Sequence, residues 1–218
     1  MYITIAMDQL QPTEREIEIK IDLGSFTNYL KLVGFLGRLD GEVSQRNTFF
    51  DTGRQQLMKA GWALRVRVEN DRGLLTVKGL HAERGAAMVR REIECEIPRS
   101  QAESCVQLDT PIMALDLAPV NLIREVVGDA DLVVLTAFNN TRQLKSFRIG
   151  ESDYRLEIDK TEFADGSCDY EIEVELDSEE PIEAVSRGLR KLLESLDIEF
   201  VIQTETKFAR ALARAGLL

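Results

Sequence analysis

The stretch E-R-E-I-E-I-K-I-D at residues 14–22 decides the fold, because charged and aliphatic residues alternate along it from Glu16 onward. Successive side chains of a β-strand point to opposite faces, so Glu16, Glu18 and Lys20 share one face and the isoleucines share the other. In an ordinary antiparallel sheet, the charged face of such a strand meets water. Whether the charged face of residues 14–22 also meets water depends on the strands around it.

Similar patterns predict strands in both halves of the chain. Four more are expected before residue 100, at residues 47–51, 62–68, 75–78 and 89–97, and two later ones at 154–163 and 170–176. The turn sequences N-D-R-G at residues 70–73 and D-G at 165–166 join neighbouring strands as hairpins. Residues 132–140 and 142–149 are expected to form a further hairpin.

Helical patterns separate and follow these strands. Helices are expected at residues 26–34, as two or three short segments within 100–128, at 182–196 and at 205–215. Ser25 is a candidate N-cap of the first helix, and Pro181 stands at the start of the helix expected at 182–196. The chain is therefore predicted to have an α+β fold.

The composition suits one globular domain and argues against several functions. The chain has 218 residues, of which 44% are hydrophobic, and a formal net charge of −11. No nucleic acid or membrane partner is expected, because an acidic protein lacks a broad attraction for polyanions. No apolar run reaches the roughly 18–20 residues of a membrane helix, and no signal peptide is evident. We expect a cytoplasmic protein with an irregular lead-in at residues 1–13 and a domain at 14–218.

Cysteine and histidine offer few routes to catalysis. Cys95, Cys105 and Cys168 are scattered and odd in number, which argues against a disulfide framework or a thiolate zinc site. The single histidine, His81, lies in a turn-like stretch and is expected to be a surface residue. Chemistry in this chain must therefore use carboxylates, lysines and arginines.

Charges of both signs share one face of the predicted strands, whereas the opposite face is aliphatic. If helices cover the aliphatic face and the sheet closes on itself, the charged face lines the lumen of a barrel. The acidic candidates for this lumen are Glu16, Glu18, Glu92, Glu94, Glu157, Asp159, Glu171 and Glu173. The basic candidates are Lys20, Arg65, Arg67, Lys78, Arg90, Arg142 and Lys207.

Such a lumen indicates a site for metal ions and phosphate. Enclosed charges must be paired or metal-bound, and adjacent carboxylates such as Glu171 and Glu173 repel each other unless a cation lies between them. Mg²⁺ prefers oxygen ligands and is usually held by one or two carboxylates together with substrate phosphates. Arginine and lysine suit the remaining phosphate oxygens.

Short motifs along the chain resemble, in order, those of the CYTH, or triphosphate tunnel metalloenzyme, family. They are E-I-E-I-K at 16–20, F-F-D-T at 49–52, L-R-V-R at 64–67, T-V-K at 76–78, R-R-E-I-E at 90–94, E-I-D at 157–159, E-I-E at 171–173 and T-K-F at 206–208. The longer segment Q-R-N-T-F-F-D-T at 45–52 is similar to the plant-type tripolyphosphatase branch. The resemblance extends from about residue 14 to the C-terminus.

This resemblance implies a closed eight-stranded antiparallel barrel, flanked by helices, that holds a small-molecule triphosphate and Mg²⁺ or Mn²⁺, with two ions expected. It implies that the triphosphate is bound by Lys20, Arg65, Arg67, Lys78, Arg90, Arg142 and Lys207. Strand phase favours Arg90 over its neighbour Arg91. The implied metal ligands are Glu16, Glu18, Glu157, Asp159, Glu171 and Glu173, with Glu92 and Glu94 as further acids of the lumen. Whether the protein is a monomer or a homodimer is left open.

The expected reaction is hydrolysis of the terminal phosphoanhydride, with inorganic tripolyphosphate as the first candidate substrate. One ion would bridge phosphate oxygens, and a second, held by Glu171 and Glu173 with Glu18, would activate water. With Lys207, these are the candidate catalytic residues. Alternatives are a class IV adenylate cyclase, which forms cyclic AMP and pyrophosphate from ATP, a thiamine triphosphatase, and a non-catalytic module that binds polyphosphate or a nucleotide. Trp62 could stack on an organic ring, although packing is the commoner role.

Overall fold

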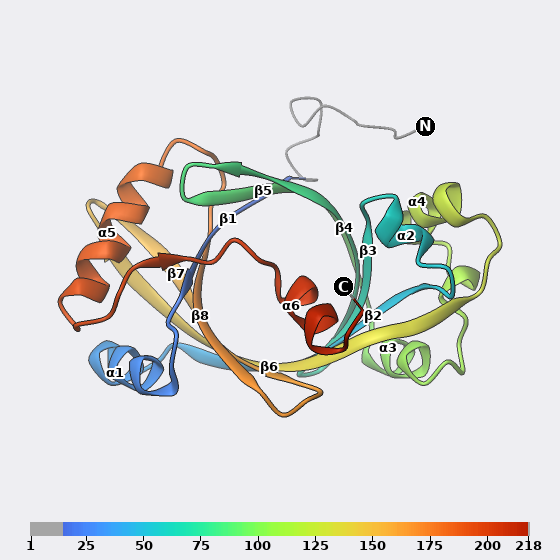
Figure 1. Ribbon diagram of the computed structural model, residues 1–218, viewed down its shortest axis with the longest axis horizontal. Coiled ribbons are helices and arrows are strands. Elements are labelled where there is room, and N and C mark those ends of the chain that lie inside the picture. The colour runs from blue at the N-terminus through green and yellow to red at the C-terminus, as the bar shows by residue number, and fades with distance from the viewer. Residues whose placement is uncertain (1–14, 218) are drawn as a thin grey trace.

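Eight strands form a closed antiparallel barrel. The computed structural model describes residues 15–217, so the predicted lead-in at 1–13 lies outside the described part. The strands are β1 (Arg15–Asp22), β2 (Gly41–Thr52), β3 (Ala63–Glu69), β4 (Arg72–Arg84), β5 (Ala87–Pro98), β6 (Leu132–Ile149), β7 (Ser152–Phe163) and β8 (Cys168–Glu175). They pair in the order β5-β4-β3-β2-β6-β7-β8-β1, and the pairing of β1 with β5 closes the ring (Figure 1). The predicted fold class is confirmed.

Helices cover the barrel on two opposite flanks (Figure 1). One flank carries α1 (Phe26–Leu36) and α5 (Ile182–Glu194), and the other carries α2 (Gln56–Lys59), α3 (Arg99–Val106), the 3₁₀ helix η3 (Ile112–Ala114) and α4 (Ala118–Val127). Buried aliphatic side chains of the strands, such as Ile19 and Leu75, pack under these helices. The aliphatic faces of the strands therefore point outward, as predicted. No helix within residues 15–217 has the length and apolar composition that crossing a membrane requires.

The last helix, α6 (Lys207–Arg214), lies within the outline of the barrel ring (Figure 1). Phe208 of this helix stacks on Phe49 of β2, with ring centroids 4.4 Å apart. Both rings belong to a separate apolar cluster with Phe138 and Phe163. The sequence predicted this helix but not its place, which brings its first turn into the lumen.

Residues 132–149 form one strand, and the predicted hairpin there is wrong. Asparagine is common in turns, but the side chain of Asn140 instead forms hydrogen bonds to the neighbouring strands of the barrel. Its Nδ2 donates to Gln45 Oε1 at 3.0 Å, and its Oδ1 accepts from Thr161 Oγ1 at 2.9 Å. The continuous strand β6 is long enough to pair with β2 over residues 132–144 and with β7 over 138–149.

Several element boundaries also differ from the prediction. Ser25 caps α1 as expected, but the helix passes Gly34 and ends at Leu36, where Gly37 takes a φ of 66°. Glycine suits this left-handed conformation because it has no Cβ. Strand β2 begins at Gly41, before the predicted start at residue 47. The short strand β9 (Val201–Ile202), which pairs with β1, was not predicted because two residues carry no periodic signal.

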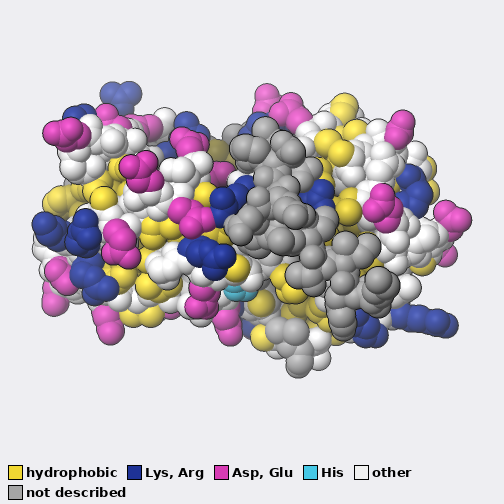
Figure 2. Space-filling model, turned by 90° about the horizontal axis from the view of Figure 1, so that it is seen from above, with side chains coloured by type: hydrophobic (Ala, Val, Ile, Leu, Met, Phe, Trp, Pro, Cys, Tyr) yellow, Lys and Arg dark blue, Asp and Glu magenta, His cyan; other side chains and the backbone are white. Residues whose placement is uncertain are grey.

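Outside the barrel, acidic and basic side chains are interspersed. Figure 2 shows both signs over the α5 flank and over the flank of α2 and α4 on the face that it displays. Interspersed surface charges of this kind are well solvated and contribute little individually to stability. The charges of the lumen, in contrast, are enclosed, so their arrangement has larger energetic consequences.

Gly73→Ala is expected to lower the free energy of unfolding by about 2 kcal/mol, through overpacking. A Cβ at residue 73 would lie 2.3 Å from the Cβ of Ala102 in α3, which has no flexible side chain to move aside. Gly34→Ala is the matched control, because a Cβ there meets nothing within 4 Å and the residue is helical. That substitution should stabilise the protein by about 0.5–1 kcal/mol. Denaturant unfolding measures both, and equal effects would contradict the packing of α3 on β4.

Candidate active site in the barrel lumen

The inward faces of the strands enclose a cavity of about 590 Å³. It is lined by all the predicted bases, Lys20, Arg65, Arg67, Lys78, Arg90, Arg142 and Lys207, and by the predicted acids Glu16, Glu18, Glu92, Glu94, Glu157 and Glu173. The two other predicted acids, Asp159 and Glu171, are almost completely buried and contact the cavity-lining Lys207. The structure thus brings every predicted site residue to one lumen.

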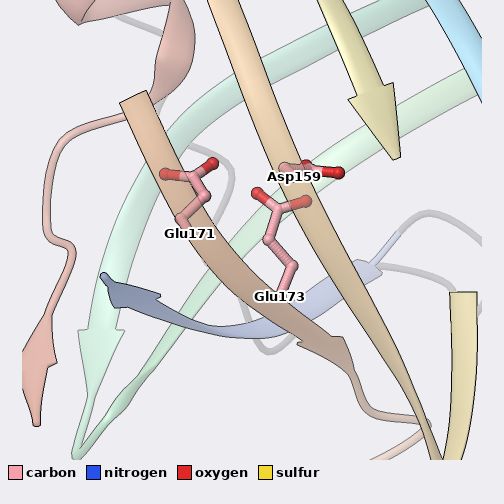
Figure 3. Close-up of side chains that lie close together, drawn as sticks. All are labelled: Asp159, Glu171 and Glu173. Atoms are coloured by element: carbon pink, nitrogen blue, oxygen red, sulfur yellow. The ribbon is translucent and has the colours of Figure 1, made fainter. Parts of the chain in front are cut away.

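Three carboxylates of adjacent strands form a compact cluster. Asp159 of β7 and Glu171 and Glu173 of β8 each offer a carboxylate oxygen, and these oxygens lie within 4.8 Å of one another. Figure 3 shows the three carboxyl groups gathered at the same side of the two strands. The register explains the grouping, because Asp159 pairs directly with Glu171 across the strands. Oxygen donors in this arrangement fit a hard divalent cation such as Mg²⁺ or Mn²⁺.

The ammonium group of Lys207 lies among these three carboxylates. Its Nζ is 2.8 Å from Asp159 Oδ2 and 2.9 Å from Glu173 Oε1, and it also forms an ion pair with Glu171. Burial alone would lower the pKa of Lys207, but the three carboxylates outweigh burial and raise it. The pKa of Glu173 is held well below its usual value, because Lys207, Lys20 and Arg142 together outweigh the effect of burial.

Two residues that support this cluster, Arg210 and Asp169, were not predicted from the sequence. Arg210 Nη2 donates to Glu171 Oε2 at 2.7 Å, and Arg210 Nε lies 2.8 Å from Asp169 Oδ2. Arg210 follows Lys207 by three residues, so both side chains project from the same side of α6. That spacing was a usable signal, although only the position of α6 in the ring shows that both residues reach Glu171.

A second group of charges surrounds β1. Lys78 Nζ is 2.8 Å from Glu16 Oε1, and Arg90 pairs with Glu16 and with Glu18, the latter at 2.9 Å. Lys20 connects the two groups, since its Nζ lies 2.9 Å from Glu18 and 3.3 Å from Glu173. Glu18 therefore approaches the three-carboxylate cluster through Lys20, and the residue grouped most closely with Glu171 and Glu173 is Asp159.

The acids of the lumen differ in how well they are neutralised. Burial would raise the pKa of Glu16, but Lys78 and Arg90 hold it well below the usual value. Burial raises the pKa of Glu92, and the adjacent Glu16 raises it further. Desolvation and repulsion by Glu16, Glu157 and Glu92 raise the pKa of Glu175, at the exposed end of β8, to about 7. The lumen therefore has excess negative charge near β1, β5 and the end of β8.

The opposite wall of the lumen is basic and only weakly neutralised. Arg65 and Arg67 project from β3, which stands opposite β8 in the closed ring. Burial lowers the pKa of Arg67 to about 10, assisted by repulsion from Arg65 and Arg142. The ion pairs of this wall are long, at 3.7 Å between Arg67 and Glu69 and 3.4 Å between Arg65 and Glu94. An anion between the two walls would relieve the repulsion among these guanidinium groups.

Three sequence expectations about individual side chains concern the rim of the lumen. Arg90 points into the cavity, whereas Arg91 lies over the ring of Trp62, 5.9 Å from its centroid. Trp62 borders the cavity but also packs against the core under α2–α4. His81 is exposed at the cavity edge, as predicted, but it lies within β4 and pairs with Arg90, so the expected turn there is wrong.

Arg67→Met is expected to raise the free energy of unfolding at pH 7 by about 1 kcal/mol. The lowered pKa of Arg67 would by itself correspond to a larger gain, of roughly 3 kcal/mol. Part of that gain is lost with the hydrogen bond to Asn47. The pKa of Arg67 in the folded protein is below its unfolded value, so its charge opposes folding at pH values below about 10. The gain should shrink as the pH rises above that value.

Arg90→Met is the matched control for this prediction. The pKa of Arg90 is raised, because Glu16 and Glu18 outweigh burial, so its removal should destabilise the fold. Denaturant unfolding at several pH values compares the two variants. Destabilisation of similar size in both would contradict the unequal neutralisation of the lumen.

Comparison with known proteins bears on this arrangement. A family model described as the CYTH domain matches residues 14–211. The structure is similar to HpAC1 from Hippeastrum, a candidate adenylyl cyclase described as having a dominant triphosphatase activity, with 26% identity, a TM-score of 0.80 and coverage of 93% of this chain and 97% of that one. It is also similar to a candidate adenylate cyclase from Bacillus halodurans, with 25% identity, a TM-score of 0.69 and coverage of 90% and 98%. The PH1819 protein from Pyrococcus horikoshii, at 17% identity, a TM-score of 0.58 and coverage of 90% and 99%, shares the fold. No curated protein gives a significant match.

Proposed function

The chain belongs to the CYTH domain family, and on this basis we propose that it hydrolyses a triphosphate in the lumen, with inorganic tripolyphosphate as substrate and Mg²⁺ or Mn²⁺ as cofactor. The observation that carries the proposal is the division of the lumen into two walls. The three-carboxylate cluster of Asp159, Glu171 and Glu173 faces a basic wall that includes Arg65 and Arg67. A polyanion and divalent cations together satisfy both walls, whereas either one alone satisfies only one of them.

The carboxylates suit the proposed cofactor. Asp159, Glu171 and Glu173 would hold one divalent cation, and Glu16, Glu18 and Glu157 are the proposed ligands for a second. Bound cations supply positive charge to phosphate oxygens and lower the pKa of a bound water. Lys207 and Arg142, which contact the same carboxylates, are placed to exchange these partners for phosphate oxygens.

The bases of the lumen have distinct proposed roles. Arg65, Arg67 and Arg142 present guanidinium groups that can bind phosphate oxygens in pairs, whereas Lys20, Lys78 and Lys207 act as point charges. Phosphoryl transfer needs positioning and compensation of spread negative charge more than covalent chemistry from the protein. Charged groups held by the barrel supply both without reorganising during the reaction. Arg90 holds Glu16 and Glu18 in place and contributes to the same field.

Two observations support an inorganic substrate. The charged groups of both walls serve phosphate and metal, and the aromatic side chains Phe49, Phe138 and Phe208, which also line the cavity, pack on one another beside α6. Trp62, which also borders the cavity, has Arg91 over its ring. The triphosphatase activity described for the Hippeastrum protein agrees with hydrolysis. A cyclase is the second candidate, because the Bacillus halodurans protein is described as a candidate adenylate cyclase.

The test is a substrate panel with purified protein and Mg²⁺ or Mn²⁺. Tripolyphosphate, ATP, thiamine triphosphate and long-chain polyphosphate are supplied separately, and phosphate, pyrophosphate and cyclic AMP are quantified. We expect phosphate and pyrophosphate from tripolyphosphate, with turnover lost in EDTA and restored by the cation. Cyclic AMP with pyrophosphate from ATP would overturn hydrolysis in favour of the cyclase. Binding of the triphosphates without turnover of any of them would indicate a non-catalytic module.

A further inference from the structure

Asn47 is a buried amide on the basic wall to which no role has been assigned above. It lies on β2, with 1% of its surface exposed, and its side chain lines the cavity. It pairs in register with Arg67 of β3 on one side and with Phe138 of β6 on the other. The amide therefore borders the same part of the lumen as the weakly neutralised arginines.

The orientation of this amide is determined by its neighbour. Arg67 Nε donates to Asn47 Oδ1 at 2.9 Å. The reversed amide would place its NH₂ group against the N–H of a guanidinium, donor against donor, so the observed orientation is strongly favoured. The Nδ2 group must consequently point away from Arg67.

Asn47 Nδ2 is a buried donor without a hydrogen-bond partner among residues 15–217. The nearby Arg65 Nε likewise has no hydrogen-bond partner among these residues, although Arg65 Nη2 donates to Thr76 Oγ1 at 3.1 Å and to Glu94 Oε2 at 3.4 Å. Buried donors without partners cost free energy, and most such groups in folded proteins are satisfied. Two of them beside a guanidinium that repels its neighbours indicate a place for an acceptor-rich anion.

We propose that Asn47 is a substrate-binding residue, whose Nδ2 donates to an oxygen of the phosphoryl group held between Arg65 and Arg67. This proposal rests on the triphosphate substrate proposed above and deepens it. Strands β2 and β3 stand opposite β1 and β8 in the ring, so this phosphoryl group is the one farther from the three-carboxylate cluster. Asn47 acts on binding more than on the reacting bond, and it also fixes the orientation of the Arg67 guanidinium.

Asn47→Asp tests the Nδ2 group specifically, because it replaces that NH₂ by an oxygen and leaves an acceptor for Arg67 Nε. Tripolyphosphate binding is measured by calorimetry in EDTA, and KM and kcat are measured with the cation. We expect binding to weaken by about 100-fold and KM to rise accordingly, since a donor is replaced by a repelling charge. The value of kcat should stay within about threefold of the wild type.

Asn47→Ala is the second variant, since it adds no charge and should fold if the aspartate variant does not. It is expected to weaken binding by about tenfold, the effect of one hydrogen bond to a charged acceptor. Asn139→Asp is the matched control, because Asn139 lies on the exposed face of β6 and undergoes the same chemical change. Its binding and turnover should equal those of the wild type. Thermal melts establish that each variant is folded.

The outcomes separate this proposal from the proposed function. Unchanged binding in the folded Asn47 variants, with a wild type that hydrolyses tripolyphosphate, overturns the role of Asn47 and leaves the function standing. Weakened binding in these variants, with a wild type that binds but does not hydrolyse any substrate of the panel, supports Asn47 and overturns hydrolysis. A wild type that binds no triphosphate in EDTA or with the cation overturns both. A loss in kcat without a change in binding would also overturn the role assigned here.

Discussion

Glu173→Gln is expected to reduce metal-dependent hydrolysis of tripolyphosphate by about a hundredfold or more, which corresponds to the loss of roughly 3 kcal/mol of transition-state stabilisation. Glu173 is a member of the three-carboxylate cluster, and it also contacts Lys20, Arg142 and Lys207. Its replacement by an amide of the same shape removes one negative charge from the centre of the acidic wall. Affinity for Mn²⁺ should fall for the same reason.

The same substitution should act in the opposite direction on triphosphate binding in EDTA. With one carboxylate charge fewer, the lumen is more positive, so tripolyphosphate should bind at least as tightly as in the wild type. Calorimetry with Mn²⁺ and with tripolyphosphate separates the two effects, and phosphate release measures turnover. Glu162→Gln on the exposed side of β7 is the matched control and should change none of these quantities.

The stability of the Glu173 variant needs a separate measurement. Lys20, Arg142 and Lys207 each keep another carboxylate partner, namely Glu18, Asp159 or Glu171, so the variant should fold with a cost of about 3 kcal/mol. A folded variant that keeps its turnover within threefold of the wild type would show that Glu173 is not part of the catalytic centre.

Lys207→Met is expected to tighten the binding of Mn²⁺ by about tenfold or more while it reduces turnover by about a hundredfold. The ammonium of Lys207 lies among the same three carboxylates that are proposed to hold the cation. The two positive charges therefore compete for one position, and removal of the lysine leaves the carboxylates to the metal. Turnover still falls, because Lys207 is also a proposed phosphate ligand.

Thermal melts provide a readout of this competition that does not depend on activity. Without the ammonium, the buried carboxylates repel one another, so the variant should melt at a lower temperature than the wild type in EDTA. Added Mn²⁺ should raise its melting temperature more than that of the wild type. Lys160→Met, which removes a lysine from a more exposed position on β7, should behave as the wild type does. Equal or weaker Mn²⁺ binding by the Lys207 variant would contradict the competition.

The strands of the barrel were predictable to the extent that their signal is local. Alternation at residues 14–22 and at residues 62–68 determined which side chains share a face, and the structure agrees for Glu16, Arg65 and Arg67. The exception, the single strand β6, is instructive. Asn140 resembles a turn residue by type, and only its partners on β2 and β7 satisfy its amide in an extended chain. Such partners are distant in sequence and leave no local signal.

The residue pattern by itself determined only that charges of both signs share one face of the sheet, a face that either encloses ligands or meets water, and the family resemblance implied the enclosed lumen. Tertiary structure decided which charges meet. Closure of β1 on β5 placed the guanidinium groups of β3 opposite the carboxylates of β8. The entry of α6 into the ring placed Lys207 among three carboxylates, and the register of β2 with β3 left Asn47 Nδ2 without a partner among residues 15–217. Strand faces follow from the two-residue repeat of the backbone, whereas contacts across a lumen depend on pairings between distant segments.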